Sequence, residues 1–540
     1  MTESDPHSFD LIDQPWLLVR RLDGSVTELS LLETFRQSGD LAGLVGEVPT
    51  QVFALTRILL AVVHDVTEGP RDLDEWSELW SADELPVEDI AAYLDRCRDR
   101  FDLFHPRTPF LQVAGLRTAK GEVSGLDKII ADIPNGKPFF STRLGSDQAL
   151  TFAEAARWVV HCHAFDPSGI KSGAVGDDRV KGGKGYPIGT GWSGYLGGVL
   201  PEGANLRETL LLNLIARDFD LTAADACVDR PAWRRAPVTA GVEDPDGRAP
   251  TGPVDLFTWQ SRRIRLVPQG DKVVGVLVCN GDRVMPQNKF RFEPHSAWRR
   301  SQAQEKKLRE PTVYMPLEHD PERAIWRGLQ ALLPQAAAVG QSSEASARLA
   351  PGVLKWLALL GDDVIGPDFP IRLRTIGMTY GSQSSTTAEI IDDALSIQSI
   401  LLSQSAAELR GKVLSCVEAA ENGAKALGSL AANLTAASGG DPAGSRERAK
   451  ESAYAELDGP FRDWVSRLGP NSDAIEQQVL WHRLAGQVVR GLGQDLLDRA
   501  SPSSWTGRVV KNRLVTSSHA DIWFHRELRE AFRLAYPDIT

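Results

Sequence analysis

Two short segments of this 540-residue chain carry side chains suited to binding phosphate groups or nucleic-acid bases. The first, residues 166–203, contains 12 glycines together with Lys171, Arg179, Lys181 and Lys184. Glycine lets the backbone approach a ligand closely because it has no Cβ, and lysine and arginine attract phosphate whatever the base sequence. A mobile surface loop that binds nothing explains the same composition equally well.

The second segment, QNKFRF at residues 287–292, has the alternation of a short strand. Phe290 and Phe292 are expected to face the core, and Lys289 to face the opposite way. Residues 257–310 hold 12 Lys and Arg against 5 Asp and Glu, whereas the whole chain has a formal net charge of −12. Because salt screens each charge within about 10 Å, such a basic region can bind nucleic acid in an acidic protein. A solvated, arginine-rich hairpin is the alternative interpretation.

Signatures of an active site are absent from the sequence. There is no GxxxxGK[ST], so GGKGY at 182–186 is not a P-loop, and there is no GxSxG or HExxH motif. His161 and His163 flank Cys162, but side chains two positions apart on a helix point to different faces, which argues against a metal site. We therefore expect no metal, no cofactor and no catalytic residues.

Several observations favour the cytosol as the location. The five cysteines are far apart and form no CxxC pair, which argues against a disulfide framework. No apolar run approaches the roughly 18 residues of a membrane span. The N-terminus, MTESDPHSFD, is acidic and lacks the features of a secretory signal.

The hydrophobic pattern predicts an α+β fold with two domains. Residues 1–378 are expected to form a large mixed domain, and residues 379–540 an all-α four-helix bundle without strands. Strands are expected within 255–292. Helices are expected at 48–66, 87–104, 147–165, 206–215, 385–410, 411–436, 446–467, 473–499 and 519–534.

Five segments together resemble the CasA family, the large subunit of the type I-E CRISPR surveillance complex called Cascade. They occur in the order and approximate spacing of that family, and with the predicted architecture the resemblance covers nearly the whole chain. The segments are FDLIDQPWLLV (9–19), FDLFHPRTPFLQ (101–112), LRETLLLNLI (206–215), LFTWQSRRIRL (256–266) and NKFRF (288–292).

The resemblance implies a non-catalytic function in a cytoplasmic ribonucleoprotein. Members of this family recognise the protospacer-adjacent motif (PAM) on double-stranded DNA, largely from the minor groove, and promote duplex opening and R-loop formation. Sequence specificity then passes to pairing between guide RNA and DNA. The implied partners are target DNA, the 5′ end of the guide RNA, the other Cascade subunits and a helicase–nuclease.

The resemblance also assigns functional residues. Lys289 is the candidate to enter the minor groove, and Gln383 the candidate wedge that separates the strands from a hairpin. The loop at residues 168–171, which follows a helix and Pro167, would approach DNA with its backbone. The family loop is richer in glycine at these four positions than this sequence is. The implied DNA-binding residues are Lys289, Ser168, Gly169, Ile170, Lys171, Gly173, Gln383, Ser382 and Ser384, and the implied guide-RNA-anchoring residues are Lys137, Phe139, Phe140 and Arg143.

Two other functional classes remain open from the residues alone. A phosphate- or nucleotide-handling enzyme would use the glycine-rich loop at 168–185, and would need a P-loop or a metal-binding carboxylate set beside it. A purely architectural scaffold would tolerate changes in the loops and would depend on the bundle for assembly.

Overall fold

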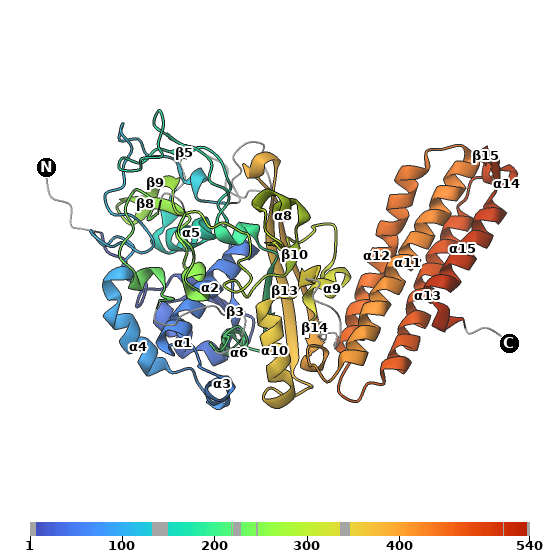
Figure 1. Cartoon of the computed structure of the whole chain (residues 1–540), viewed down its shortest axis with the longest axis horizontal. Helices are drawn as coiled ribbons and strands as arrows, with labels where there is room; N and C mark the ends of the chain where they lie inside the picture. Colours follow the sequence, from blue (N-terminus) through green and yellow to red (C-terminus); the bar gives the residue numbers. More distant parts are fainter. Residues whose placement is uncertain are drawn as a thin grey trace. The chain divides into compact units, whose positions relative to one another are not determined.

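The computed structural model describes residues 7–131, 149–217, 219, 228–244, 247–334, 346–510 and 512–536. The chain divides into two compact units (Figure 1). The first comprises Met1–Glu322, Ala338–Leu357 and Arg372–Ala394, and the second comprises Arg323–Ala337, Ala358–Ile371 and Leu395–Thr540. The first unit mixes helices with small sheets and the second is mainly helical, so the predicted α+β class is confirmed.

The first unit combines helices with small sheets. Its helices are α1 (Leu31–Arg36), α2 (Pro49–Val66), α3 (Leu73–Ser81), α4 (Val87–Arg96), α5 (Phe152–Phe165), α6 (Leu206–Leu212), α7 (Pro253–Phe257), α8 (Gln302–Leu308) and the start of α10 (Gly352–Asp363). Its strands are β1 (Leu17–Arg21), β2 (Val26–Leu29), β3 (Leu41–Leu44), β4 (Leu150–Thr151), β5 (Lys171–Ser172), β6 (Lys184–Gly185), β7 (Gly198–Glu202), β8 (Arg262–Gln269), β9 (Lys272–Asn280), β10 (Trp298–Arg300), β11 (Tyr314–Pro316), β12 (Arg348–Leu349) and most of β13 (Pro370–Tyr380) and β14 (Thr387–Gln398). The sheets have the orders β2-β1-β3, β4-β9-β8, β14-β13-β7, β11-β10-β12 and β5-β6.

Local sequence explains the helices that position the candidate site. Helix α2 starts with Pro49, which suits a first turn because its missing N–H has no helical partner there, and almost the whole helix is buried. Helix α5 starts with a capping box in which the side chains of Thr151 and Glu154 satisfy each other's backbone N–H groups. The helix expected at 48–66 is confirmed, the helix expected at 206–215 forms but ends at Leu212, and β8 and β9 are strands expected within 255–292.

Two further expected helices are also shorter than the pattern indicates. The helix expected at 87–104 ends at Arg96, because residues beyond it pair with the N-terminal segment instead. There the N–H of Leu11 donates to the carbonyl of Phe101, and the N–H of Leu103 donates to the carbonyl of Phe9, both at 3.0 Å. The helix expected at 147–165 begins only at residue 152, since β4 precedes it.

A buried ion pair ties α2 to the turn around residue 289. The Arg57 guanidinium donates two hydrogen bonds to the Glu293 carboxylate, at 2.9 and 2.8 Å, and the side chains are 2% and 0% exposed. Glu293 also accepts hydrogen bonds from Trp192 Nε1 at 2.6 Å and from the backbone N–H of His295 at 3.1 Å. The guanidinium lies 4.6 Å from the ring centre of Phe257. Four segments distant in sequence therefore meet at one ion pair.

We predict that Arg57→Ala lowers the free energy of unfolding by about 3–5 kcal/mol, because the change leaves a buried carboxylate without its counter-charge. Urea denaturation measures this loss. The matched control is Arg36→Ala, whose ion pair with Glu33 at 2.9 Å is exposed, and whose loss should cost at most about 1 kcal/mol. Equal losses in the two variants would contradict the structural importance of the buried pair.

The second unit is built around four long helices, as predicted. They are α11 (Ala407–Ser438), α12 (Pro442–Ser466), α13 (Ala474–Asp498) and α15 (Ser517–Ala531), accompanied by α9 (Leu329–Leu332), α14 (Ser503–Thr506) and the antiparallel strands β15 (Arg508–Val510) and β16 (Arg513–Val515). Helix α11 packs against α12, α13 and α15. In the core, the ring of Phe461 stacks on Trp326 and meets Trp481 edge-on. Within the described residues, no helix is long and apolar enough to cross a membrane.

Part of the predicted bundle is wrong. Residues 385–410 do not form its first helix: 387–398 form strand β14, and helix begins only at Ala407. Thr387, Ile390 and Ile391 favour an extended chain, and the long neighbouring strand β13 supplies a pairing partner. The short strands β15 and β16 also lie where no strand was expected. The boundary predicted between residues 378 and 379 falls inside β13.

Candidate nucleic-acid interface

Between Asp166 and Gly173, the loop after α5 exposes only a small tip. Ser168 is buried, whereas Ile170 is 59% exposed. Gly169 between them has φ of +147°, a conformation that favours glycine, and a Cβ added there would meet no atom within 4 Å. Among the implied DNA-binding positions 168–173, the part open to a ligand is therefore the Gly169–Ile170 backbone and the Ile170 side chain. Farther along the loop, Lys181 and Lys184 are exposed as well.

Lys171 lies beside this tip but is engaged within the protein. Its Nζ is 2.5 Å from Asp166 Oδ2, and its side chain is only 12% exposed. Arg262 Nε donates to the same oxygen at 2.5 Å. Burial alone would raise the pKa of Asp166, but the two cations outweigh burial and hold that pKa below its ordinary value. The charge of Lys171 thus neutralises Asp166 instead of facing solvent.

Gly173 serves the internal packing of the loop. A Cβ at this position would lie 2.5 Å from Val180 and 2.6 Å from the backbone of Gly183. The N–H of Gly173 also donates to the carbonyl of Gly183 at 3.0 Å. The need for glycine here is explained by the close approach of two arms of the same loop.

The segment 287–292 is a turn, so the expected strand is wrong. Asn288 has φ of 56° and reverses the chain. The N–H groups of Phe292 and Glu293 both donate to the carbonyl of Lys289, at 2.9 and 3.0 Å. Because these groups are satisfied locally, the segment needs no partner strand. Phe290 packs against a core cluster that includes Trp298 and Tyr314, as expected, and Phe292 packs on the same cluster.

Lys289 is half-buried at the edge of this turn. Its Nζ donates to the carbonyl of Gln287 at 3.3 Å. Burial lowers the pKa of Lys289, although the nearby Glu310 carboxylate acts in the opposite direction. The hydrogen bond to the Gln287 carbonyl already restricts the Lys289 side chain. The side chain therefore loses less conformational freedom when it binds a ligand.

Helix α8 adds a basic surface next to the Lys289 turn. Gln287 contacts Gln304 of α8 at 3.4 Å, and Asn288 donates to Glu310, just after the helix, at 3.1 Å. Three exposed cations follow on this helix and at its end: Lys306, Lys307 and Arg309. Sequence reasoning counted them in the basic region without assigning them a role. The signal that could have found them is the KKLR run beside the Lys289 segment.

The positive charge of residues 257–310 is divided between the core and the surface. Arg262 and Arg263 are each 1% exposed and pair with Asp166 and Asp282, respectively, so neither can reach a ligand. The exposed cations of this region are Arg283, Arg291, Arg299, Lys306, Lys307 and Arg309.

Gln383 lies at the tip of the hairpin formed by β13 and β14. The turn Ser382–Ser384 places Gln383 and Ser384 at φ of 56° and 54°. Ser382 and Gln383 are exposed and Ser384 is half-buried. A long hairpin ending in exposed polar side chains has the shape that a strand-separating wedge requires.

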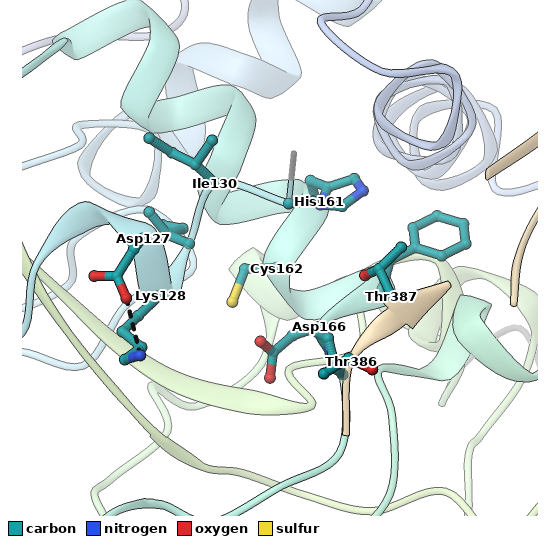
Figure 2. A pocket seen from close by; sticks show the side chains of 12 residues that line it. Asp127, Lys128, Ile130, His161, Cys162, Asp166, Thr386 and Thr387 are labelled. Carbon is teal, nitrogen blue, oxygen red and sulfur yellow. Dashed lines mark ion pairs between the residues drawn. The ribbon is translucent and has the colours of Figure 1, made fainter. Parts of the chain in front are cut away.

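The tip end of this hairpin contacts the start of the glycine loop. The Tyr380 hydroxyl donates to the carbonyl of Phe165, the last residue of α5, at 2.7 Å. Nearby, a cavity of about 30 Å³ is lined by residues of 127–131, the end of α5, and Thr386 and Thr387. Figure 2 shows Asp166 and Thr386 on the same side of this cavity. The loop and the turn of the hairpin therefore start from one shared cluster at the end of α5.

The remaining candidates lie elsewhere or cannot be placed. Lys137, Phe139, Phe140 and Arg143 lie outside the described residues. His161 contacts Thr50 at 2.9 Å, and burial lowers the pKa of His161 to about 3. In the described part of the chain, no three His, Cys, Asp or Glu side chains are grouped so that they could hold a metal ion.

We predict that Lys171→Met lowers the free energy of unfolding by about 1–3 kcal/mol, because Asp166 loses a charged partner. The control is Lys184→Met on the paired strand β6, where the side chain is exposed and the change should stay within about 0.5 kcal/mol. Urea denaturation of both variants gives the comparison. If Lys171→Met proved as neutral as the control, the ion pair with Asp166 would contribute nothing to folding.

The chain matches known proteins over most of its length. The family model of CRISPR-associated protein Cse1 matches residues 10–492. A CRISPR-associated protein CasA/Cse1 from Thermus thermophilus is 29% identical over 493 residues, which are 89% of this chain and 86% of the relative.

Solved structures show the same fold over the full length. The crystal structure of Thermobifida fusca Cse1 is 49% identical with a TM-score of 0.91, covering 99% of this chain and 100% of that one. Cse1 from Acidimicrobium ferrooxidans is 31% identical with a TM-score of 0.83 and the same coverage. A chain of a CRISPR RNA-guided surveillance complex is 21% identical with a TM-score of 0.71, covering 98% of this chain and all of that one, which shows a shared fold. This chain belongs to the CRISPR-associated protein Cse1 family.

Proposed function

We propose that this chain is the non-catalytic large subunit of a CRISPR RNA-guided surveillance complex and recognises the PAM on double-stranded DNA. One observation carries the proposal most strongly: in a member of the Cse1 family, the exposed loop tip and the exposed hairpin tip start from one shared cluster at the end of α5. The shared fold with a chain of a surveillance complex also supports it.

Duplex DNA is the ligand that these features suit. The Gly169–Ile170 tip offers backbone that can approach a minor groove about 6 Å wide without a bulky side chain at Gly169. Lys289 supplies a flexible point charge for the acceptors on the groove floor. The exposed cations at the end of α8 add attraction to the phosphates on the same side as the Lys289 turn.

Gln383 and its neighbours Ser382 and Ser384 then act as the wedge. Inserting a side chain at one base step offsets part of the cost of unstacking, which is a few kcal/mol. Strand separation next becomes a near-balanced exchange of DNA duplex for RNA–DNA heteroduplex. The resulting R-loop would be the state to which the complex recruits its helicase–nuclease, with the guide-RNA 5′ end held by the segment containing Lys137, Phe139, Phe140 and Arg143.

For Lys289→Ala, we expect the assembled complex to bind a PAM-containing duplex about tenfold more weakly, since a lost groove contact costs about 1–3 kcal/mol. A titration of labelled duplex with the guide-RNA-loaded complex measures this. Lys120→Ala, at an exposed lysine paired with Glu122, is the control and should bind normally. Unchanged PAM-dependent binding by Lys289→Ala would reject the groove-reading assignment.

For Gln383→Ala, we expect duplex opening to slow about tenfold or more while initial PAM binding stays near normal, because the wedge acts on unstacking. Fluorescence of 2-aminopurine placed beside the PAM follows opening. A target whose first base pairs are already mismatched should open equally well with and without the change. A similar loss on closed and pre-opened targets would argue against a wedge.

A further inference from the structure

The buried side chain of Arg262 joins the two ends of the glycine-rich loop. These ends, residues 166–167 and 189–191, form the neck of the loop. Arg262 Nη2 donates to the carbonyls of Pro167 at 3.1 Å and Gly189 at 2.8 Å, which lie on the two arms of the loop. The same nitrogen contacts the carbonyl of Asp166 at 3.1 Å, and Nε binds the Asp166 carboxylate. One guanidinium therefore bonds to both ends of a segment of more than 20 residues.

Backbone hydrogen bonds also join the two arms of the loop, at the neck and between β5 and β6. The N–H of Gly191 donates to the carbonyl of Asp166 at 2.9 Å. Lys171, the residue after the exposed tip, also reaches the Asp166 carboxylate at 2.5 Å. The exposed tip at Gly169 and Ile170 thus lies between two positions, 167 and 171, that are both bound to the Asp166–Arg262 pair.

We propose that Arg262 is a positioning residue for DNA recognition: it holds the loop neck closed so that the Gly169–Ile170 tip meets the duplex in one geometry. The inference rests on the proposed function, since it assigns the loop tip to DNA contact. A loop that is already ordered loses less conformational entropy on binding than one that must be ordered by its ligand. Arg262 itself is 1% exposed and does not reach DNA.

Arginine is required here by its geometry. A guanidinium presents five N–H donors in a fixed planar fork, and so can bond a carboxylate and several carbonyls at once. A lysine at the same position keeps the charge for Asp166, but its single nitrogen cannot also span the carbonyls of both arms. Arg262→Lys therefore preserves charge neutralisation while releasing the neck.

The chain supplies a matched control in the next residue. Arg263 is also on β8, is equally buried and pairs with Asp282 at 2.6 Å. Its nitrogens donate to carbonyls of Thr239 at 2.7 Å and Gly241 at 3.0 Å, and not to the loop neck. Arg263→Lys thus makes the same chemical change at the same depth without opening the neck.

Hydrogen exchange measured by mass spectrometry tests the neck directly in the full chain. With Arg262→Lys, amides of residues 168–188 should exchange about tenfold faster than in the wild type, because the loop opens locally. With Arg263→Lys, the same amides should keep wild-type rates. Wild-type exchange in Arg262→Lys would overturn the proposal.

Binding by the assembled, guide-loaded complex tests the consequence. Arg262→Lys should bind a closed PAM-containing duplex about tenfold more weakly, yet bind a pre-opened target that needs no PAM as the wild type does. An equal loss on both targets, or a similar loss in Arg263→Lys, would show general destabilisation and overturn the positioning role.

A loop-tip variant separates this inference from the proposed function. Ile170→Asp adds a negative charge that DNA phosphates repel, so closed-duplex binding should fall. If Ile170→Asp weakens binding but Arg262→Lys does not, the tip reads DNA and the positioning role of Arg262 is wrong. If Ile170→Asp leaves binding unchanged, DNA contact by the loop itself is wrong, and the inference about Arg262 falls with it.

Discussion

The ion pair between Arg57 and Glu293 is the constraint on which the first unit depends. Two charges removed from water are tolerated only when each is fully bonded, and Glu293 receives donors from α2, from Trp192 and from the backbone of His295. The N–H of Glu293 also closes the turn that carries Lys289. Trp192 follows Gly191, which bonds to the loop neck at Asp166. A candidate groove-reading lysine and a candidate DNA-binding loop are thereby held by one buried carboxylate.

The carboxylate of Asp166 likewise binds side chains from separate segments. Asp166 gathers Lys171 and Arg262, two cations that charge counting places among possible nucleic-acid contacts. In the structure both cations bond to Asp166 and are largely withdrawn from solvent, whereas other cations of the basic region are exposed. The interface therefore depends less on the total charge of a segment than on which cations have buried partners, because a paired, desolvated cation contributes little to the external field.

Sequence reasoning succeeded where a pattern depends on local physics. The buried run of α2 and the strands β8 and β9 follow from hydrophobic periodicity, which acts over a few residues. It failed where a distant partner decides the conformation. Residues 387–398 become a strand because β13 lies beside them, and Lys289 sits in a turn because Asn288 bonds to Tyr314, 26 positions away.

By itself, the sequence determined the fold class, the bundle of long helices and, through five ordered segments, the family to which the chain belongs. It also identified the three short stretches that form the candidate interface. Only the tertiary structure decided which side chains in those stretches are open to a ligand. Lys171 is withdrawn into an ion pair and Gly173 into packing, whereas Ile170 and Gln383 face solvent. The physical reason is that burial and pairing are set by contacts between segments far apart in the chain, and no local pattern encodes them.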